Sequence, residues 1–170
     1  MSDRVRSRGA VGLPWVLLLC GALAVPPLQA AEIVRRQQGS FPIASTVTVP
    51  PGSELVFVRG MLADVAKPEA PEGSVERYGD TEAQAGSVLR KIAAALEAAG
   101  LGLADVVKMN VFLVGDPALG GRMDFDGLMR AYSRHYGGAA QPNLPARTTV
   151  QVVALPRAGA LVEIEVVAAR

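Results

Sequence analysis

Two charged residues of opposite sign stand in the last part of the sequence, in segments that otherwise have the composition of β-strands. Arg147 lies in "NLPARTTVQVVAL" (residues 143–155), two residues after a proline, and Glu163 lies in "VEIEV" (162–166). An arginine presents a planar fork of N–H donors that holds a carboxylate through two parallel hydrogen bonds. The pattern therefore raises the question of whether Arg147 and Glu163 act together on one ligand.

The pairing of the two strands decides how far apart these charges lie. In a hairpin symmetric about "PRAGA", Val153 lies opposite Glu163 and Arg147 lies opposite Ala169, all on one face because side chains alternate with period two. The two charges are then about six residues apart along the ladder, or roughly 20 Å at ~3.3 Å per residue. The hairpin therefore predicts no pairing within one chain, and joint action requires Arg147 of one subunit and Glu163 of a neighbour.

The segments before the hairpin predict two more strands, a loop and a helix. "TVTVPPGSELVFVRGMLA" predicts two short strands joined by a Pro-Pro-Gly-Ser turn. Residues 64–80 are polar and rich in Pro and Gly, which predicts a loop long enough to be a candidate lid. A capping box of Thr81 and Gln84 then starts a helix with apolar residues at helical spacing, and Gly100 ends it.

A third strand and a second helix follow. "DVVKMNVFLVG" is typical of a half-buried strand, with one apolar face made of Val107, Met109, Val111 and Leu113. The second helix is expected at about 124–136, ending at Gly137-Gly138, and its apolar side consists of Phe125, Leu128, Met129 and Tyr132. The order β-β-α-β-α-β-β predicts an α+β domain, and the mixed apolar and charged faces of the last two strands predict a subunit interface.

The first thirty residues have the layout of a secretory signal rather than of the domain. A start with three arginines and one acid precedes the apolar run "VGLPWVLLLCGALAV", and small residues follow at the cut site. The division is therefore a signal peptide at 1–30 and a domain at 31–170, which is periplasmic or secreted and free of the membrane after cleavage. An uncleaved N-terminal anchor is the alternative, and a lipoprotein at Cys20 is disfavoured because Leu19 is not small.

Composition excludes several classes of function for the mature domain. Removing residues 1–30 lowers Lys+Arg from 17 to 14 and Asp+Glu from 16 to 15, which gives a net charge of −1. The single cysteine leaves as well, so no disulfide or thiol nucleophile is expected. One histidine argues against a zinc or iron site. A nearly neutral chain without basic clusters does not indicate a nucleic-acid partner.

The C-terminal segment "PARTTVQVVALPRAGALVEIEVVA" closely resembles the signature of the RidA/YjgF family. In that signature Pro-Ala-Arg-(Ser/Thr) precedes a Leu-Pro turn and a Val-Glu-Ile-Glu strand. The resemblance extends back through "GDTEAQAGSVLRKIAAALEAAGLGLADVVKMNVFLVGD" to "LVFVRG", and thus covers nearly all of 41–170. It implies a chorismate-mutase-like α+β fold, with a mixed sheet and two helices on one face, and homotrimers with ligand clefts between subunits.

The resemblance also implies an activity and a set of site residues. The family hydrolyses reactive imines and enamines to 2-keto acids and ammonia, without a metal or an organic cofactor. It implies that Arg147 holds the carboxylate of a small substrate, that Glu163 positions and deprotonates a water, and that the Gly60 backbone approaches the ligand.

Several positions depart from the family pattern. Arg59 stands where many deaminase members have serine and offers a second contact for an anion, and Thr149 stands where they have cysteine. Ile43 and Met129 replace an aromatic residue and an asparagine. These departures keep a second class of function open, a non-catalytic trimeric binding protein for small acidic metabolites or an interaction module.

Overall fold

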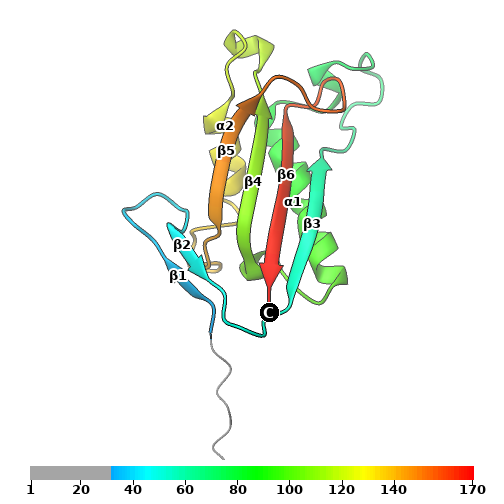
Figure 1. The fold of residues 1–170 in the computed structure, drawn as a ribbon. Coiled ribbons are helices and arrows are strands. Elements are labelled where there is room, and N and C mark those ends of the chain that lie inside the picture. The colour runs from blue at the N-terminus through cyan, green and yellow to red at the C-terminus, as the bar shows by residue number, and fades with distance from the viewer. Residues whose placement is uncertain (1–31) are drawn as a thin grey trace, which may run out of the picture. The chain divides into compact units, whose positions relative to one another are not determined.

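A mixed four-stranded sheet with two helices on one of its faces forms the main body of the computed structural model, which describes residues 32–170 (Figure 1). The strands lie in the order β3 (Leu55–Leu62), β6 (Val162–Ala169), β4 (Val106–Val114) and β5 (Ala146–Val152). Strand β6 is antiparallel to both neighbours, whereas β4 and β5 are parallel. This architecture confirms the expected α+β fold. The predicted signal peptide at 1–30 lies outside the described residues.

The predicted hairpin of the last two strands is wrong, because β4 lies between β5 and β6. The connection 153–161 crosses the end of β4 instead of folding back on β5. The central positions go to β4 and β6, whose apolar side chains are buried against the helices. Strand β5 carries Arg147, Thr148, Thr149 and Gln151, and polar residues of this kind suit the edge of a sheet.

This topology also overturns the expectation that Arg147 and Glu163 share one face. Arg147 pairs with Met109, which is buried under the helices, so Arg147 points to the helix side. Glu163 alternates with the buried residues Val162 and Ile164 and therefore points to the other side. The two charges still do not pair within one chain, but the physical reason is that the sheet lies between them.

The N-terminal residues form a second, two-stranded sheet of β1 (Val34–Arg36) and β2 (Thr46–Thr48). The two strands predicted around the Pro-Pro-Gly-Ser turn are confirmed as β2 and β3, and β2 pairs with β1 rather than with β3. This small sheet is fixed to the main body through backbone oxygens. The Arg35 Nη2 donates to the carbonyl oxygen of Ala104 at 3.1 Å, and the Ala44 N–H donates to that of Pro145 at 3.0 Å.

Helix α1 (Thr81–Ala98) ends as predicted but begins differently. Gly100, with φ of 73°, follows the last turn, a conformation that glycine adopts without steric cost. The expected capping box is wrong, because the side chain of Asp80 accepts the hydrogen bond from the Ala83 N–H. Gln84 instead points into the core.

Helix α2 (Phe125–Tyr132) is shorter than the predicted 124–136, since tighter turns replace the helix after Tyr132. Leu128 and Tyr132 are buried as expected, but Phe125 and Met129 are only half-buried. Three short 3-10 helices, η1 (Val75–Arg77), η2 (Leu103–Asp105) and η3 (Pro117–Leu119), complete the fold. No helix of residues 32–170 has the length and apolar character needed to cross a lipid bilayer.

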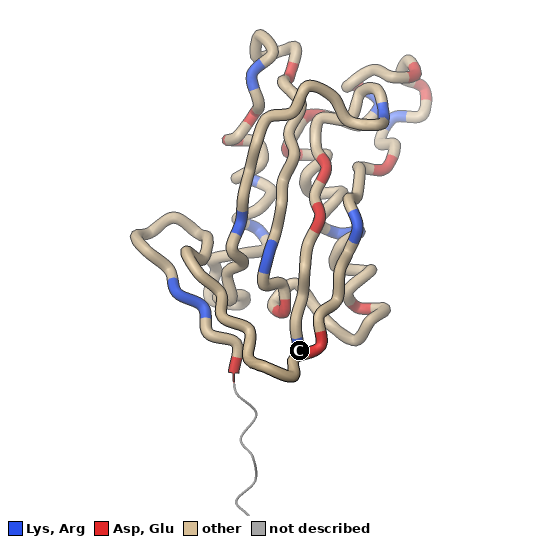
Figure 2. The backbone as a smooth tube through the Cα atoms, in the orientation of Figure 1, with Lys and Arg blue, Asp and Glu red and all other residues tan. Residues whose placement is uncertain are grey.

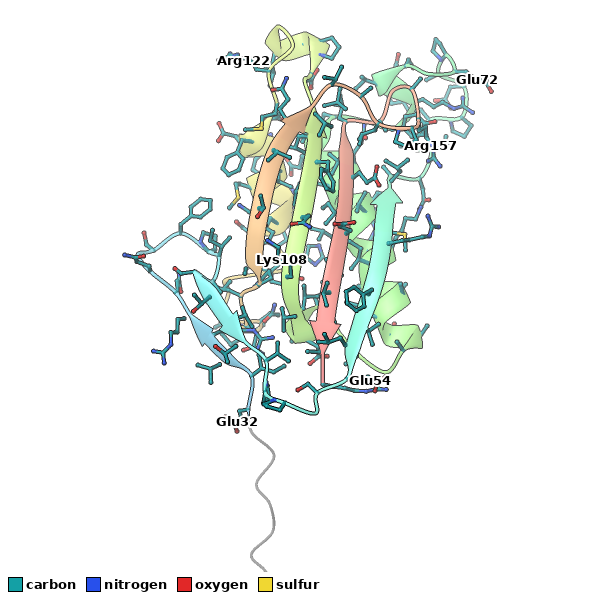
Figure 3. The ribbon with its side chains drawn as sticks, in the orientation of Figure 1. Glu32, Glu54, Glu72, Lys108, Arg122 and Arg157 are labelled. Atoms are coloured by element: carbon teal, nitrogen blue, oxygen red, sulfur yellow. The ribbon has the colours of Figure 1, made fainter. Side chains whose placement is uncertain are left out.

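The sheet face away from the helices is partly apolar and carries few charges. Phe57 is 73% exposed there, and Leu55 is exposed as well. Polar side chains pair across this face, with the Lys108 Nζ donating to the Thr148 Oγ1 at 3.0 Å. Figure 3 shows Lys108 on this face. An apolar face of this kind suits contact with another protein surface better than contact with water.

Hydrogen bonds between α1 and the loop before β6 give a test of the fold. The buried Gln84 Nε2 donates to the carbonyl oxygens of Gly79 (2.8 Å) and Gly159 (3.1 Å), and its Oε1 accepts from the Leu161 N–H at 2.8 Å. We expect Gln84→Ala to lower the free energy of unfolding by about 3 kcal/mol, because it opens a cavity and leaves a buried N–H without an acceptor. Urea denaturation measures the change.

The matched control for this substitution is Gln38→Ala, at an exposed position, for which we expect a change within about 0.5 kcal/mol. A loss below about 1 kcal/mol in Gln84→Ala would show that these three hydrogen bonds do not hold the loop.

Candidate functional site

The guanidinium of Arg147 lies in a cage of aromatic rings and a thioether on the helix side of β5. Its Cζ is 4.3 Å from the ring centroid of Tyr132, and the rings of Phe41 and Phe125 lie 5.6 and 5.8 Å away. The Nη2 donates to the Met129 Sδ at 3.2 Å. Guanidinium groups favour the faces of aromatic rings, so the cage orients Arg147 without neutralising its charge.

The rest of the Arg147 guanidinium is buried without a partner. Its Nε and Nη1 have no hydrogen-bond acceptor within residues 32–170. Burial lowers the pKa of Arg147, and the phenol of Tyr132 opposes that shift. Burial in turn raises the pKa of Tyr132 to about 12, so this phenol stays neutral and donates to the Pro42 carbonyl oxygen at 2.9 Å. Arg147 therefore remains a buried cation without a counter-ion, which favours binding of an anion.

Thr149 extends this site along β5. It lies two residues after Arg147 on the same side of the sheet, and its Oγ1 is buried without a partner. The two residues thus hold three buried polar atoms that have no hydrogen-bond partner among residues 32–170. Carboxylate oxygens accept hydrogen bonds from guanidinium and hydroxyl groups alike, so the arrangement fits a carboxylate.

Glu163, Gly60 and Arg59 meet at a separate pocket at the β3 edge of the sheet. The pocket has a volume of about 250 Å³ and is lined by Arg59, Gly60, Met61, Leu62, Lys91, Pro156, Arg157 and Glu163. The β3–β6 pairing shifts register between Val58 and Met61, so Gly60 lies in a bulge. The Glu163 carboxylate lies against the Gly60 backbone, where a Cβ would collide with it. A side chain at position 60 would therefore have to displace the Glu163 carboxylate from this place.

The two glutamates of β6 have different surroundings. The Asn110 Nδ2 donates to the Glu165 Oε1 at 2.9 Å, so that carboxylate is already engaged. The Glu163 carboxylate has neither a hydrogen bond nor an ion pair with any residue of 32–170, and it lines the pocket. Its neighbours in the sheet are Phe112 and Leu62. A free carboxylate in a pocket can accept a proton from a bound water, which favours Glu163 over Glu165 as a candidate base.

Three of the five predicted site residues thus lie together in the structure, and the other two lie together at a different place. Arg59, Gly60 and Glu163 share the pocket, whereas Arg147 and Thr149 lie on the helix side of β5. No residue of the predicted lid 64–80 lines this pocket. Instead Arg77 ties that loop together, with its Nη1 donating to the Pro68 and Ala70 carbonyl oxygens.

Sequence reasoning missed the groups that surround both halves of the site. Phe41 supplies an aromatic ring beside Arg147, two positions before the Ile43 that marked the departure from the family pattern. Lys91, from α1, and Arg157, from the loop before β6, both line the Glu163 pocket. Their places follow from the packing of loops against the sheet, and no local sequence pattern marks them.

Comparison with known proteins gives consistent matches. The family model described as endoribonuclease L-PSP matches residues 52–170. The chain is 37% identical to Protein DfrA of Myxococcus xanthus over 127 residues, which cover 75% of this chain and 84% of that protein. It is 31% identical to a RutC family protein of Haemophilus influenzae, over 82% of this chain and 97% of the relative.

Solved structures of Escherichia coli proteins also match. The YjgF gene product is 31% identical with a TM-score of 0.51, and TdcF with bound serine is 31% identical with a TM-score of 0.52. Each comparison covers 72% of this chain and 84% of the solved one.

The unpaired charge of Arg147 gives a test of the site. We expect Arg147→Met to raise the free energy of unfolding by about 1 kcal/mol without ligand, because a buried charge without a partner costs more than an apolar side chain of similar length. Thermal unfolding of both proteins measures the change. Arg130→Met, which removes an exposed arginine paired with Glu82, is the control and should lower stability slightly. A large loss of stability in Arg147→Met would assign the guanidinium a structural role.

Proposed function

The chain belongs to the endoribonuclease L-PSP family, which includes the RidA, YjgF and RutC proteins, and on that premise we propose that it hydrolyses reactive 2-imino acids to 2-keto acids and ammonia. The observation that carries the proposal is the buried guanidinium of Arg147, which has no acceptor for its Nε and Nη1. A 2-imino acid brings a carboxylate for this group, next to the carbon that reacts.

In the proposed reaction Glu163 acts as a general base. It takes a proton from a water as the water oxygen bonds to the imine carbon, and the imine nitrogen gains a proton to give a carbinolamine. The nitrogen then takes a second proton and leaves as ammonia, while the hydroxyl loses its proton and the carbonyl of the keto acid forms. An imine carbon is already electrophilic, so positioning the substrate and activating the water supply the catalysis.

The two halves of the site are joined in this proposal by a second subunit. Arg147 and Glu163 lie on opposite sides of one sheet, so one chain does not present both to the same ligand. Homotrimers are typical of the family. We therefore propose a homotrimer in which Arg147 and Thr149 of one subunit complete the pocket formed by Glu163, Gly60 and Arg59 of the next, with the mature protein in the periplasm or secreted.

The charge distribution supports a small ligand rather than RNA. Figure 2 shows Lys and Arg scattered among Asp and Glu along residues 32–170, without a continuous basic stripe in this part of the chain. Proteins that bind nucleic acid present such a stripe or patch to the phosphates.

A non-catalytic binding protein for small acidic metabolites is the second candidate. It is favoured by Met129, whose sulfur contacts the Arg147 guanidinium at the position where the family pattern has an asparagine. A thioether is a weak acceptor and moves no proton, so the Arg147 half of the site is suited to holding an anion rather than to chemistry.

Replacement of Glu163 separates the two functions. We expect Glu163→Gln to lower the rate of imine hydrolysis by about 100-fold while ligand binding stays close to normal, because the amide keeps the shape but is no base. An amino-acid oxidase supplies 2-imino acids, and semicarbazide trapping measures their decay. Glu165→Gln is the matched control and should keep its activity. Equal activity of wild type and Glu163→Gln, in a protein that clearly hydrolyses imines, would exclude Glu163 as the base.

Mixing two inactive variants tests the shared cleft. We expect Arg147→Ala and Glu163→Gln, refolded together in equal amounts, to recover about a quarter of the wild-type activity, because random assembly restores both groups at about one cleft in four. Each variant refolded alone should stay inactive, and light scattering should give the mass of a trimer. No recovery from mixed trimers would contradict a cleft that takes these residues from different subunits.

A further inference from the structure

Positive charge exceeds negative charge around the Glu163 pocket. Three cationic side chains, Arg59, Lys91 and Arg157, line the pocket together with this one carboxylate. Lys91 is already neutralised, since its Nζ pairs with the Asp64 carboxylate at 2.5 Å and donates to the Leu62 carbonyl oxygen at 3.0 Å. Among the residues that line this pocket, two guanidinium groups thus remain against one carboxylate. The carboxylate of Glu165, which lines the adjoining pocket together with Arg59, accepts a hydrogen bond from Asn110.

Neither of the two arginines has an acidic partner in the part of the chain that the structure describes. The Arg59 side chain is exposed, and the one hydrogen bond that it forms within residues 32–170, 3.5 Å long, goes from Nη1 to the carbonyl oxygen of the adjacent Gly60. Arg157 uses Nη1 to hold the Ala63 carbonyl oxygen at 2.9 Å, which leaves its other nitrogens free for a ligand. Figure 3 shows Arg157 in the loop that leads into β6, and β6 begins at Val162, one residue before Glu163.

We infer that the pocket binds a second anionic group of the substrate, so that the preferred substrates are 2-imino dicarboxylates rather than 2-imino monocarboxylates. The inference rests on the proposed function for the imine, but the preference for a distal carboxylate follows from the charges of the pocket. A distal carboxylate next to Glu163 alone would be repelled. Arg59 offsets that repulsion with a planar fork that fits a carboxylate, and Arg157 adds a second positive charge.

Binding of two stable keto acids tests the preference without turnover. 2-Oxoglutarate and 2-oxopentanoate have the same chain length and differ in the distal carboxylate. In titration calorimetry we expect the mature protein to bind 2-oxoglutarate about tenfold more tightly than 2-oxopentanoate. Added salt should reduce this difference in affinity, because Arg59 is exposed. Arg59→Ser should reduce the preference several-fold, because only Arg157 then faces the distal carboxylate, and it should weaken 2-oxopentanoate binding much less. Arg59→Lys should retain more of the preference than Arg59→Ser.

Arg36→Ser, at an exposed position on β1, is the matched control and should keep the preference. Three results would overturn the inference. They are equal binding of the two keto acids by wild type, no binding of either by wild type, and an equal loss of affinity for both in Arg59→Ser. The corresponding imines, made from glutamate and norvaline by amino-acid oxidases, test the proposed function separately. If neither imine is hydrolysed but the binding preference holds, the proposed hydrolase fails and the assignment of the dicarboxylate pocket stands.

Discussion

Strict alternation of side chains along the two central strands is the constraint on which the rest of the structure depends. Strand β6 directs Val162, Ile164 and Val166 into the core, which leaves Glu163 and Glu165 no place except the opposite face. Because β5 continues the same sheet, the side of Arg147 is fixed by its pairing with the buried Met109. The separation of the two charged residues thus follows from the packing of one core. Within a single subunit the two side chains do not reach the same ligand.

The two halves of the candidate site handle charge differently. Arg147 is buried among aromatic rings and pays for its position in stability, since two of its nitrogens lack acceptors. Glu163 stands in a polar pocket against a bulged glycine, where cations surround it and water can reach it. A ligand that bridges the two would meet a rigid, dry anchor at one end and a wetter reactive group at the other, which is a sensible division between binding and chemistry.

Patterns of local origin were predictable from the sequence, and those set by tertiary packing were not. The apolar alternation of β4 and the stop at Gly100 depend on nearby residues, and both were predicted correctly. The predicted hairpin of β5 and β6 was wrong because neither segment indicates that β4 lies between them. Gln84 was assigned to a helix cap because its spacing fits one, but burial directs its amide to a distant loop.

The same distinction holds for the site. Arg147 and Glu163 stand out in a sequence because charges are rare in apolar strands. Phe41 and Arg157 do not stand out, because each acquires its place through contacts with residues far away along the chain. The resemblance to a known family indicated Gly60, and the structure shows that the Glu163 carboxylate lies where a side chain at position 60 would stand.

The position of β6 has a consequence for how the protein reaches its fold. It is the last of the described strands in sequence, yet it lies between β3 and β4, and its end pairs Ala169 with Leu55. Neither β3 nor β4 has its antiparallel partner until ribosomal synthesis has passed the whole of β6. Pairings of such long range slow folding and leave strand edges open to other chains in the meantime. The growing chain therefore carries two apolar strands that a holdase chaperone would recognise.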